Sequence, residues 1–344
     1  DPALDLAIER SAELFRFYIG KGAIPYGDHA PWMQTHEDNG KCGMAAVMFD
    51  TLGEPKGAEF FSRMSLASHG SERDTGHTGN FGNILWALPG VAKSGPQATG
   101  AWMKEFGSWY FDLARRWDGS FSHLGPPQKR NDAYAKWDST GSYLLSYAMP
   151  LRKIHLTGKR KGTVPQLDAT AAQSLIEDGR GWTNKYRNDA YDKLSEAELF
   201  ARLSSWSPIV RERAAMALTR RKSESVPRLI AMLSSPRLET RYGACQALAM
   251  QKGRAAAAVP ALKKLLRQDD MWLRIKAAEA LANIGKPAMS AVPNLLELLA
   301  RGPSESDPRG MEQRYLTFTV FGVMLKKSID GVDRNQLRKA IVAG

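Results

Sequence analysis

The clearest pattern in the chain is a repeat of apolar and polar positions in its C-terminal half. Three segments align without gaps, and each is followed by a Val-Pro pair and a leucine-rich run, the pairs recurring every 33 residues. Small and aliphatic residues recur three and four positions apart within each segment, as on the packed face of a helix. Proline suits the first turn of a second helix, where its missing N–H removes no hydrogen bond. Each unit is therefore predicted to be helix, turn, helix, and the period predicts a solenoid. The aligned segments are Val210–Leu218, Thr240–Leu248 and Leu273–Leu281.

A second helical pattern, marked by glycine, runs through the first 150 residues. Gly-x-x-Gly occurs at 40–43 and again at 79–82, with apolar residues at helical spacing after each pair. Because glycine inside a helix costs about 1 kcal/mol relative to alanine, such pairs indicate helices whose backbones approach closely. A first helix is predicted from Asp1 to about Ile19. A later aromatic core stripe is predicted at Trp102, Phe106, Trp109 and Leu113.

These patterns predict an all-α fold in two domains. Residues 1–155 are expected to form one helical domain, and residues 195–344 a repeat domain with a C-terminal cap. Between them, residues 156–194 mix glycine, proline and charge around a short helix that Asp168 is expected to begin. This segment is the predicted linker.

The repeated pattern x-Arg-x-x-Ala-Ala-x-Ala-Leu, followed by Val-Pro-x-Leu, resembles HEAT repeats of the short, phycobilisome-lyase type over roughly residues 195 to 302. The resemblance implies an α-solenoid that presents a curved surface to a partner. It also implies structural roles for the recurring Arg211, Arg241 and Arg274, which would bond neighbouring turns or acidic residues. Some HEAT-like proteins bind DNA or excise bases. Nucleic acid is therefore an alternative partner, disfavoured because basic and aromatic residues do not interleave along one face.

The first half resembles the α/α-toroid of terpenoid cyclases and protein prenyltransferases, in which helical hairpins ring a cavity. The resemblance lies in Gly-Ala-Ile-Pro-Tyr-Gly at 22–27, the Gly-rich helix starts and Trp-Asp-Gly-Ser-Phe at 117–121. The chain departs from both families at their reactive residues, since it has neither the Asp-rich motif of the cyclases nor the zinc set of the transferases. Terpene chemistry is therefore not expected. The combination resembles bacterial proteins in which a toroid-like part precedes HEAT repeats.

Charge is distributed unevenly between the two halves of this 344-residue chain. Residues 1–150 carry 14 basic and 17 acidic side chains, whereas residues 151–344 carry 34 and 19. Such a basic half favours a protein or anionic-polymer partner. The two cysteines exclude a disulfide-dense scaffold, and no apolar run is long enough for a membrane helix. No cofactor or metal is expected. The compartment is left open: a soluble chain is expected, with removal of an export signal before Asp1 as one alternative.

Polar residues that could perform chemistry gather just before the Gly-x-x-Gly helices. Glu37 or Asp38 with His77 could transfer a proton, as in a lyase or hydrolase acting on an anionic carbohydrate in the toroid cavity. Metal binding is an alternative, but the histidines have no recognised ligand spacing. Helix capping is the third and preferred interpretation. The residues expected to contact such a substrate are His36, Asn80, Asn83, Asp118 and His123.

Taken together, these patterns favour a helical-repeat binding or scaffolding protein. An enzyme acting on an anionic carbohydrate and a DNA-binding HEAT protein are the alternatives. Whether the chain is catalytic is left open.

Overall fold

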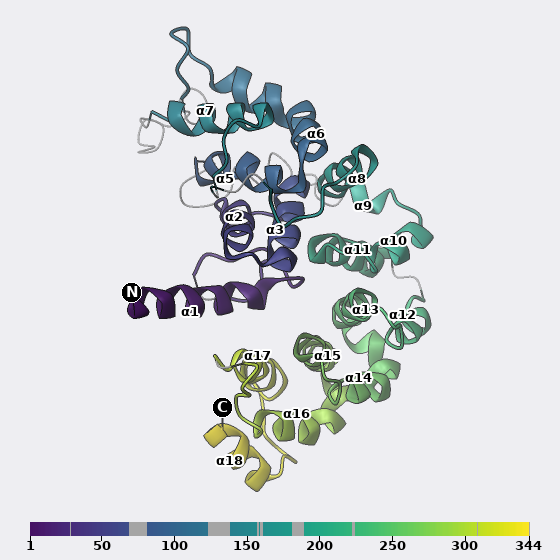
Figure 1. Cartoon of the computed structure of the whole chain (residues 1–344). Helices are drawn as coiled ribbons and strands as arrows, with labels where there is room; N and C mark the ends of the chain where they lie inside the picture. The colour runs from purple at the N-terminus through teal and green to yellow at the C-terminus, as the bar shows by residue number, and fades with distance from the viewer. Residues whose placement is uncertain are drawn as a thin grey trace, which may run out of the picture. The chain divides into compact units, whose positions relative to one another are not determined.

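A computed structural model of the chain shows an all-helical protein (Figure 1). Over the described residues there are isolated β-bridges, such as Ala23 with Trp32, but no strand. The predicted fold class is therefore confirmed. Two compact units, Asp1–Ala190 and Tyr191–Gly344, are treated one at a time below. The domain boundaries expected from composition stay a prediction. The described residues are 1–27, 29–68, 81–122, 138–156, 158, 161–180, 189–221, 224–307 and 309–343.

The N-terminal unit is a succession of helices packed in two layers. In one layer α2 packs on α5 and α5 on α7, while α3 and α6 both pack on α8 in the other. Asp1 begins the first helix as predicted, since its carboxylate accepts a hydrogen bond from the Ala3 N–H at 2.9 Å. Asp168 caps α8 in the same way. The helices are α1 (Pro2–Tyr18), α2 (Lys41–Leu52), α3 (Pro55–Ala67), α5 (Phe81–Val91), α6 (Pro96–Gly107), α7 (Thr140–Ala148) and α8 (Ala169–Gly179).

Glycine brings the backbones of α2 and α5 into direct contact. A Cβ added to Gly40 would overlap with the carbonyl group of Gly82, and one added to Gly43 would overlap with the carbonyl oxygen of Trp86. Gly40 also has a φ of +77°, a conformation that favours glycine. The close approach predicted from the Gly-x-x-Gly pattern is confirmed at Gly40 and Gly43. Because Gly40 and Gly82 stand at the beginnings of the two helices, both helices begin at the same end of the pair.

The aromatic core stripe is confirmed at its start and wrong at its end. Trp102 and Phe106 are buried, but Leu113 is 65% exposed. A π-helical turn, Ser108–Asp112, lies between them and adds a residue to the helical turn. After this turn the buried residues are Tyr110, Phe111 and Ala114, and Leu113, which an ideal helix would bury, is exposed. The Trp109 side chain lies outside the described part of the chain.

The C-terminal unit is a stack of helix pairs. Helices α11, α13, α15 and α17 form one row, and α12, α14 and α16 form a second row against it (Figure 1). Each predicted Val-Pro pair begins a second-row helix, and the capping box predicted at Ser195 and Glu198 is present. The helices are α10 (Glu196–Arg202), α11 (Pro208–Arg221), α12 (Val226–Met232), α13 (Leu238–Gln251), α14 (Val259–Leu265), α15 (Met271–Ile284), α16 (Val292–Leu299), α17 (Met311–Thr319) and α18 (Arg334–Ala343).

Two of the three recurring arginines, Arg211 and Arg274, bond backbone carbonyls of the turn that precedes their own helix. Arg241 Nη1 instead donates to Gln268 Oε1, at 3.3 Å, in the turn before the next helix of the row. Arg211 Nη1 donates to the carbonyl oxygens of Ser205 and Trp206, at 2.7 and 3.1 Å. Arg274 Nη1 donates to the carbonyls five and six positions before it, at 2.8 and 2.7 Å, and its other nitrogens bond Glu312. The structural roles predicted for these two arginines are confirmed. Because these two guanidinium groups bond atoms within the unit, they are not available to a partner.

The turn after α13 holds a lysine in a backbone conformation that suits only glycine. Lys252 has φ 53° and ψ −138°, and the equivalent position after α15 is Gly285 with φ 79° and ψ −132°. Such a conformation costs a residue with a Cβ about 1–3 kcal/mol. Lys252→Gly is therefore expected to raise the free energy of unfolding by about 1 kcal/mol, after the greater chain entropy of glycine is subtracted.

Urea unfolding at constant pH measures this change. Gly285→Ala is the matched control, because no atom lies within 4 Å of an added Cβ there and only the backbone conformation opposes it. It is expected to destabilise the protein by a similar amount. A loss of stability in Lys252→Gly would contradict the prediction.

Candidate functional site

Glu37, the first predicted acid/base residue, lies at the beginning of α2. Its side chain is fully buried. Oε1 accepts hydrogen bonds from the N–H groups of Asp38 and Cys42, both at 2.9 Å, and Oε2 accepts one from the Gly43 N–H at 3.1 Å. The Cys42 and Gly43 amides belong to the first turn of α2, which leaves them without an intrahelical partner, and a carboxylate there also interacts favourably with the helix dipole. The arrangement is that of a helix cap.

Asp38 and His36 flank this cap. Asp38 Oδ2 forms an ion pair with Lys41 Nζ at 2.6 Å, and Lys41 lies over the ring of Tyr26, 5.3 Å from its centroid. His36 is fully buried. Thr35 Oγ1 donates to the Glu37 carbonyl at 2.6 Å, which fixes the loop before α2. These contacts show that the first polar cluster, residues 36–38, fixes the N-terminal end of α2.

The second polar cluster is described only in part, because His77, Asn80 and His123 lie outside the described residues. Asn83 is buried on α5, beside Gly40. Asp118 lies in an exposed turn and accepts hydrogen bonds from the Ser120 hydroxyl at 2.6 Å and N–H at 3.0 Å. These bonds hold the pKa of Asp118 below its usual range. The catalytic role of Glu37, Asp38 and His77, and the substrate contacts, stay predictions.

A buried ion pair that the sequence pattern did not predict lies elsewhere in the N-terminal unit. The fully buried Asp50, on α2, accepts hydrogen bonds at Oδ1 from the Thr163 N–H and hydroxyl, at 2.7 and 2.8 Å. Its Oδ2 lies 3.0 Å from Lys93 Nζ. Burial raises the pKa of Asp50, but these hydrogen bonds and the ammonium charge outweigh burial and leave the pKa below its usual range. Asp50 is therefore held as a carboxylate.

Asp50 and Lys93 line a small cavity. Its volume is about 110 Å³, below the roughly 300 Å³ at which sites for drug-sized ligands begin. At about 30 Å³ for each water, it has room for a few solvent molecules. The Asp50 pair thus joins the segment around Thr163 to α2. Other polar residues in the lining are Thr99, Arg152, His155 and Gln166.

Neither cysteine has the environment of a nucleophile. Cys42 and Cys245 are free and buried, and burial raises the pKa of both thiols, that of Cys245 to about 12. The neighbouring Glu37 raises the pKa of Cys42 further. The reactive thiolate is therefore disfavoured at both positions. Among the described residues, no group of three or more His, Cys, Asp and Glu side chains is placed to hold a metal ion.

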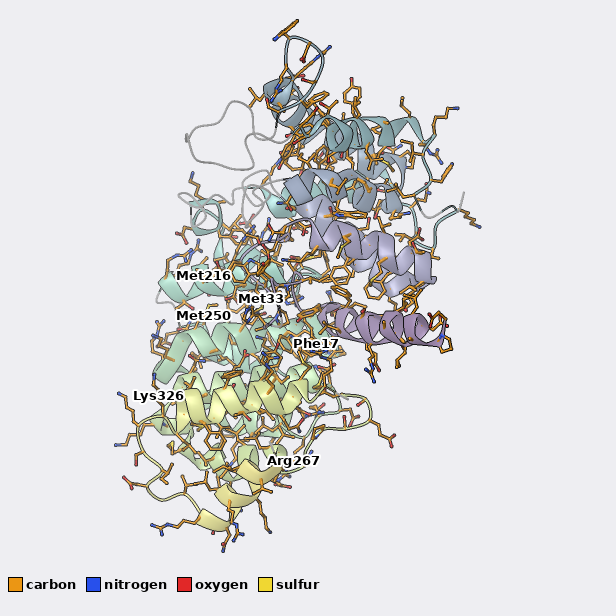
Figure 2. The ribbon with its side chains drawn as sticks, turned by 90° about the vertical axis from the view of Figure 1, so that its left-hand side faces the viewer. Phe17, Met33, Met216, Met250, Arg267 and Lys326 are labelled. Carbon is orange, nitrogen blue, oxygen red and sulfur yellow. The ribbon has the colours of Figure 1, made fainter. Side chains whose placement is uncertain are left out.

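The C-terminal unit carries a line of exposed cations along one edge. They lie in the turns that follow α13, α15 and α17, and Met250 and Lys326 mark this edge in Figure 2, with Arg267 placed away from it. Neighbouring helices pack about 8–10 Å apart, so successive turns repeat at that spacing. Within the described part of the chain, the four lysines of this set form no ion pair, and Arg254 bonds the Thr219 carbonyl. We call this set the basic turn edge: Lys252, Arg254, Lys286, Lys326 and Lys327.

Comparison with known proteins finds two family models along the chain. Residues 1–158 match the family model of a domain of unknown function, DUF6288. Residues 196–271 and 226–307 match HEAT repeats. No curated protein and no solved structure gives a match to the chain. A search of the described helices finds none with both the length and the apolar character needed to cross a membrane. The C-terminal half therefore contains HEAT repeats, which commonly mediate protein interactions.

Proposed function

We propose that the chain is a scaffold whose HEAT repeats bind an acidic protein partner along the basic turn edge. The observation that carries this proposal is the recurrence of exposed cations in successive turns on one side of the stack. Residues 191–344 contain 26 Lys and Arg against 15 Asp and Glu. Arg211 and Arg274 are engaged inside the unit, whereas the turn lysines are exposed and recur along one edge.

An acidic polypeptide fits this edge better than a nucleic acid does. Single-stranded nucleic acid is usually bound with aromatic side chains on which bases stack. The large exposed apolar side chains of this unit include one aromatic residue in the described part, Phe318, which lies on α17 outside the basic turn edge. Rows of exposed lysine supply charge without stacking surfaces. Such an edge favours an extended partner with regularly spaced carboxylates.

Binding of fluorescent poly-L-glutamate to the full chain tests the proposal. The triple variant Lys286→Gln, Lys326→Gln, Lys327→Gln is expected to weaken binding by roughly threefold to 150-fold, because each exposed ion pair contributes roughly 0.2–1 kcal/mol. The effect should shrink as salt is raised, since exposed charges are screened.

The matched control removes the same number of exposed cations away from the edge, in Lys264→Gln, Arg267→Gln, Arg338→Gln. It is expected to weaken binding much less than the edge variant. Equal losses in the two triple variants would contradict a defined edge. Tighter binding of duplex DNA or heparin than of polyglutamate would contradict an acidic protein partner.

We further propose that the N-terminal unit is an arc of α/α-hairpins related to the toroids. Its support is the two-layer packing, in which α2, α5 and α7 follow one another in one layer, and the common starting end of α2 and α5. An experimental structure of the full chain tests this. Alternating inner and outer helices around one axis would support it, and a single flat row would contradict it.

A further inference from the structure

The N-terminal half of α1 extends beyond the helices of its own unit (Figure 1). Every residue from position 1 to position 11 is exposed, and the first buried residue of the helix is Ala12. Three large apolar side chains lie in this exposed stretch: Leu4 is 59%, Leu6 52% and Ile8 42% exposed. A helix in water obtains most of its stability from packing its apolar face against another surface. Within the described part of the N-terminal unit, no other element covers the apolar side chains of this half of α1.

The exposed half of α1 combines an apolar stripe with an acidic one. Leu4 and Ile8 are four residues apart and lie on the same face. Asp5, Glu9 and Glu13 follow one another at the same spacing and form an acidic stripe beside them. A complementary surface must therefore offer both an apolar groove and positive charge.

The far end of the HEAT stack has both. One side of α17 faces α15: Glu312 bonds Arg274, and Tyr315 packs edge-on against Trp272 with ring centroids 5.9 Å apart. The opposite side borders a groove of about 410 Å³. Phe318, in this groove, is 63% exposed. The other α17 residues at the groove are Gln313, Arg314 and Thr317.

The groove has the polarity that an acidic helix requires. Both charged residues that line it, Arg309 and Arg314, are cationic. Nearby α18 has three exposed cations and no carboxylate. The Gln313 side chain is buried and donates to the Gly302 carbonyl at 2.6 Å, which ties α17 to the segment before it.

We propose that α1 of one copy of this chain docks into the groove beside α17 of a second copy. The apolar stripe of α1 would cover Phe318, and its carboxylates would face Arg309 and Arg314. Because the two surfaces differ, the contact is head-to-tail and leaves one of each surface free in a dimer, so that longer chains or rings can form. A helix that docks in a groove contacts it through side chains three or four positions apart, as Leu4 and Ile8 are on α1. This docking does not depend on the acidic partner proposed for the basic turn edge.

The experiment is sedimentation equilibrium of the full chain over a concentration series. The native chain is expected to self-associate, and more weakly at about 0.5 M salt than at about 0.05 M, since the facing charges are then screened. Leu4→Arg with Ile8→Arg removes one surface, and Phe318→Glu removes the other. Each variant alone is expected to be monomeric. Leu113→Glu, at an equally exposed apolar side chain elsewhere, should associate like the native chain.

Mixing the two variants tests the head-to-tail arrangement. An equimolar mixture of the α1 variant and the Phe318 variant retains one intact α1 and one intact groove, and is expected to form dimers and nothing larger. A native chain that stays monomeric up to its solubility limit would overturn the proposal. So would self-association of either variant alone, or a mixture that does not associate. All variants keep the basic turn edge, so polyglutamate binding should be unchanged.

Discussion

Gly43→Ala is expected to lower the free energy of unfolding by about 2–4 kcal/mol, the range of a severe overpacking change. The added Cβ would overlap with the carbonyl oxygen of Trp86 on the neighbouring helix. Backbone cannot rotate aside as a long side chain can, so α2 and α5 must separate. Separation would also disturb the Glu37 cap, because the Gly43 N–H is one of its donors. Thermal unfolding followed by circular dichroism measures the effect.

Gly100→Ala is the matched control for this substitution. Gly100 lies within α6, and no atom lies within 4 Å of an added Cβ. The same exchange there should stabilise the protein by up to about 1 kcal/mol, because alanine is the better helix former. If Gly43→Ala were as stable as the native chain, the close approach of α2 and α5 would be disproved.

Asp50→Asn is expected to cost about 2–4 kcal/mol of stability, since it removes the charge from a buried, fully bonded carboxylate and leaves Lys93 without its partner. The loss depends on pH. Because the native pKa of Asp50 lies below its value of about 3.9 in the unfolded chain, the carboxylate stabilises the native state above that pH. This contribution disappears as the pH falls through the native pKa.

The native chain and Asp50→Asn should therefore differ most near neutral pH and converge in acid. Urea unfolding at a series of pH values measures the difference. Thr163→Val removes the hydroxyl bond but keeps the N–H bond, and should cost about 1 kcal/mol. Glu13→Gln, on the exposed side of α1, serves as a surface control and should have little effect. A constant difference between the native chain and Asp50→Asn at every pH would contradict a carboxylate role for Asp50.

Features set by neighbours in the sequence were predictable. The Val-Pro helix starts, the Ser195 cap and the turn bonds of Arg211 all depend on residues within about six positions. The glycine contact between α2 and α5 was predictable because glycine weakens a helix, so a pair of glycines marks a place where larger side chains would not fit. Leu113 was assigned to the core wrongly because a single π-helical turn shifts the register, and the apolar spacing is the same with or without it.

The candidate site was harder to predict because its decisive partners are remote. Thr163 lies 113 residues from Asp50, and no local spacing connects them. Asp50 also follows an apolar run near the end of α2, and in the sequence it cannot be told apart from an ordinary exposed residue at a helix terminus. Glu37 was recognised as notable, but a carboxylate before a helix has the same sequence signature whether it accepts protons or backbone amides. Its burial and its three N–H donors separate the two cases.

The arginines of the HEAT repeats have a consequence for how the array can change in evolution. Arg211 and Arg274 each satisfy carbonyls five and six positions earlier, inside their own repeat. Duplicating or deleting a whole repeat would move donor and acceptors together and leave no orphaned carbonyl. In these two repeats the turn is therefore fixed by contacts inside the repeat, independently of how many repeats stand before it.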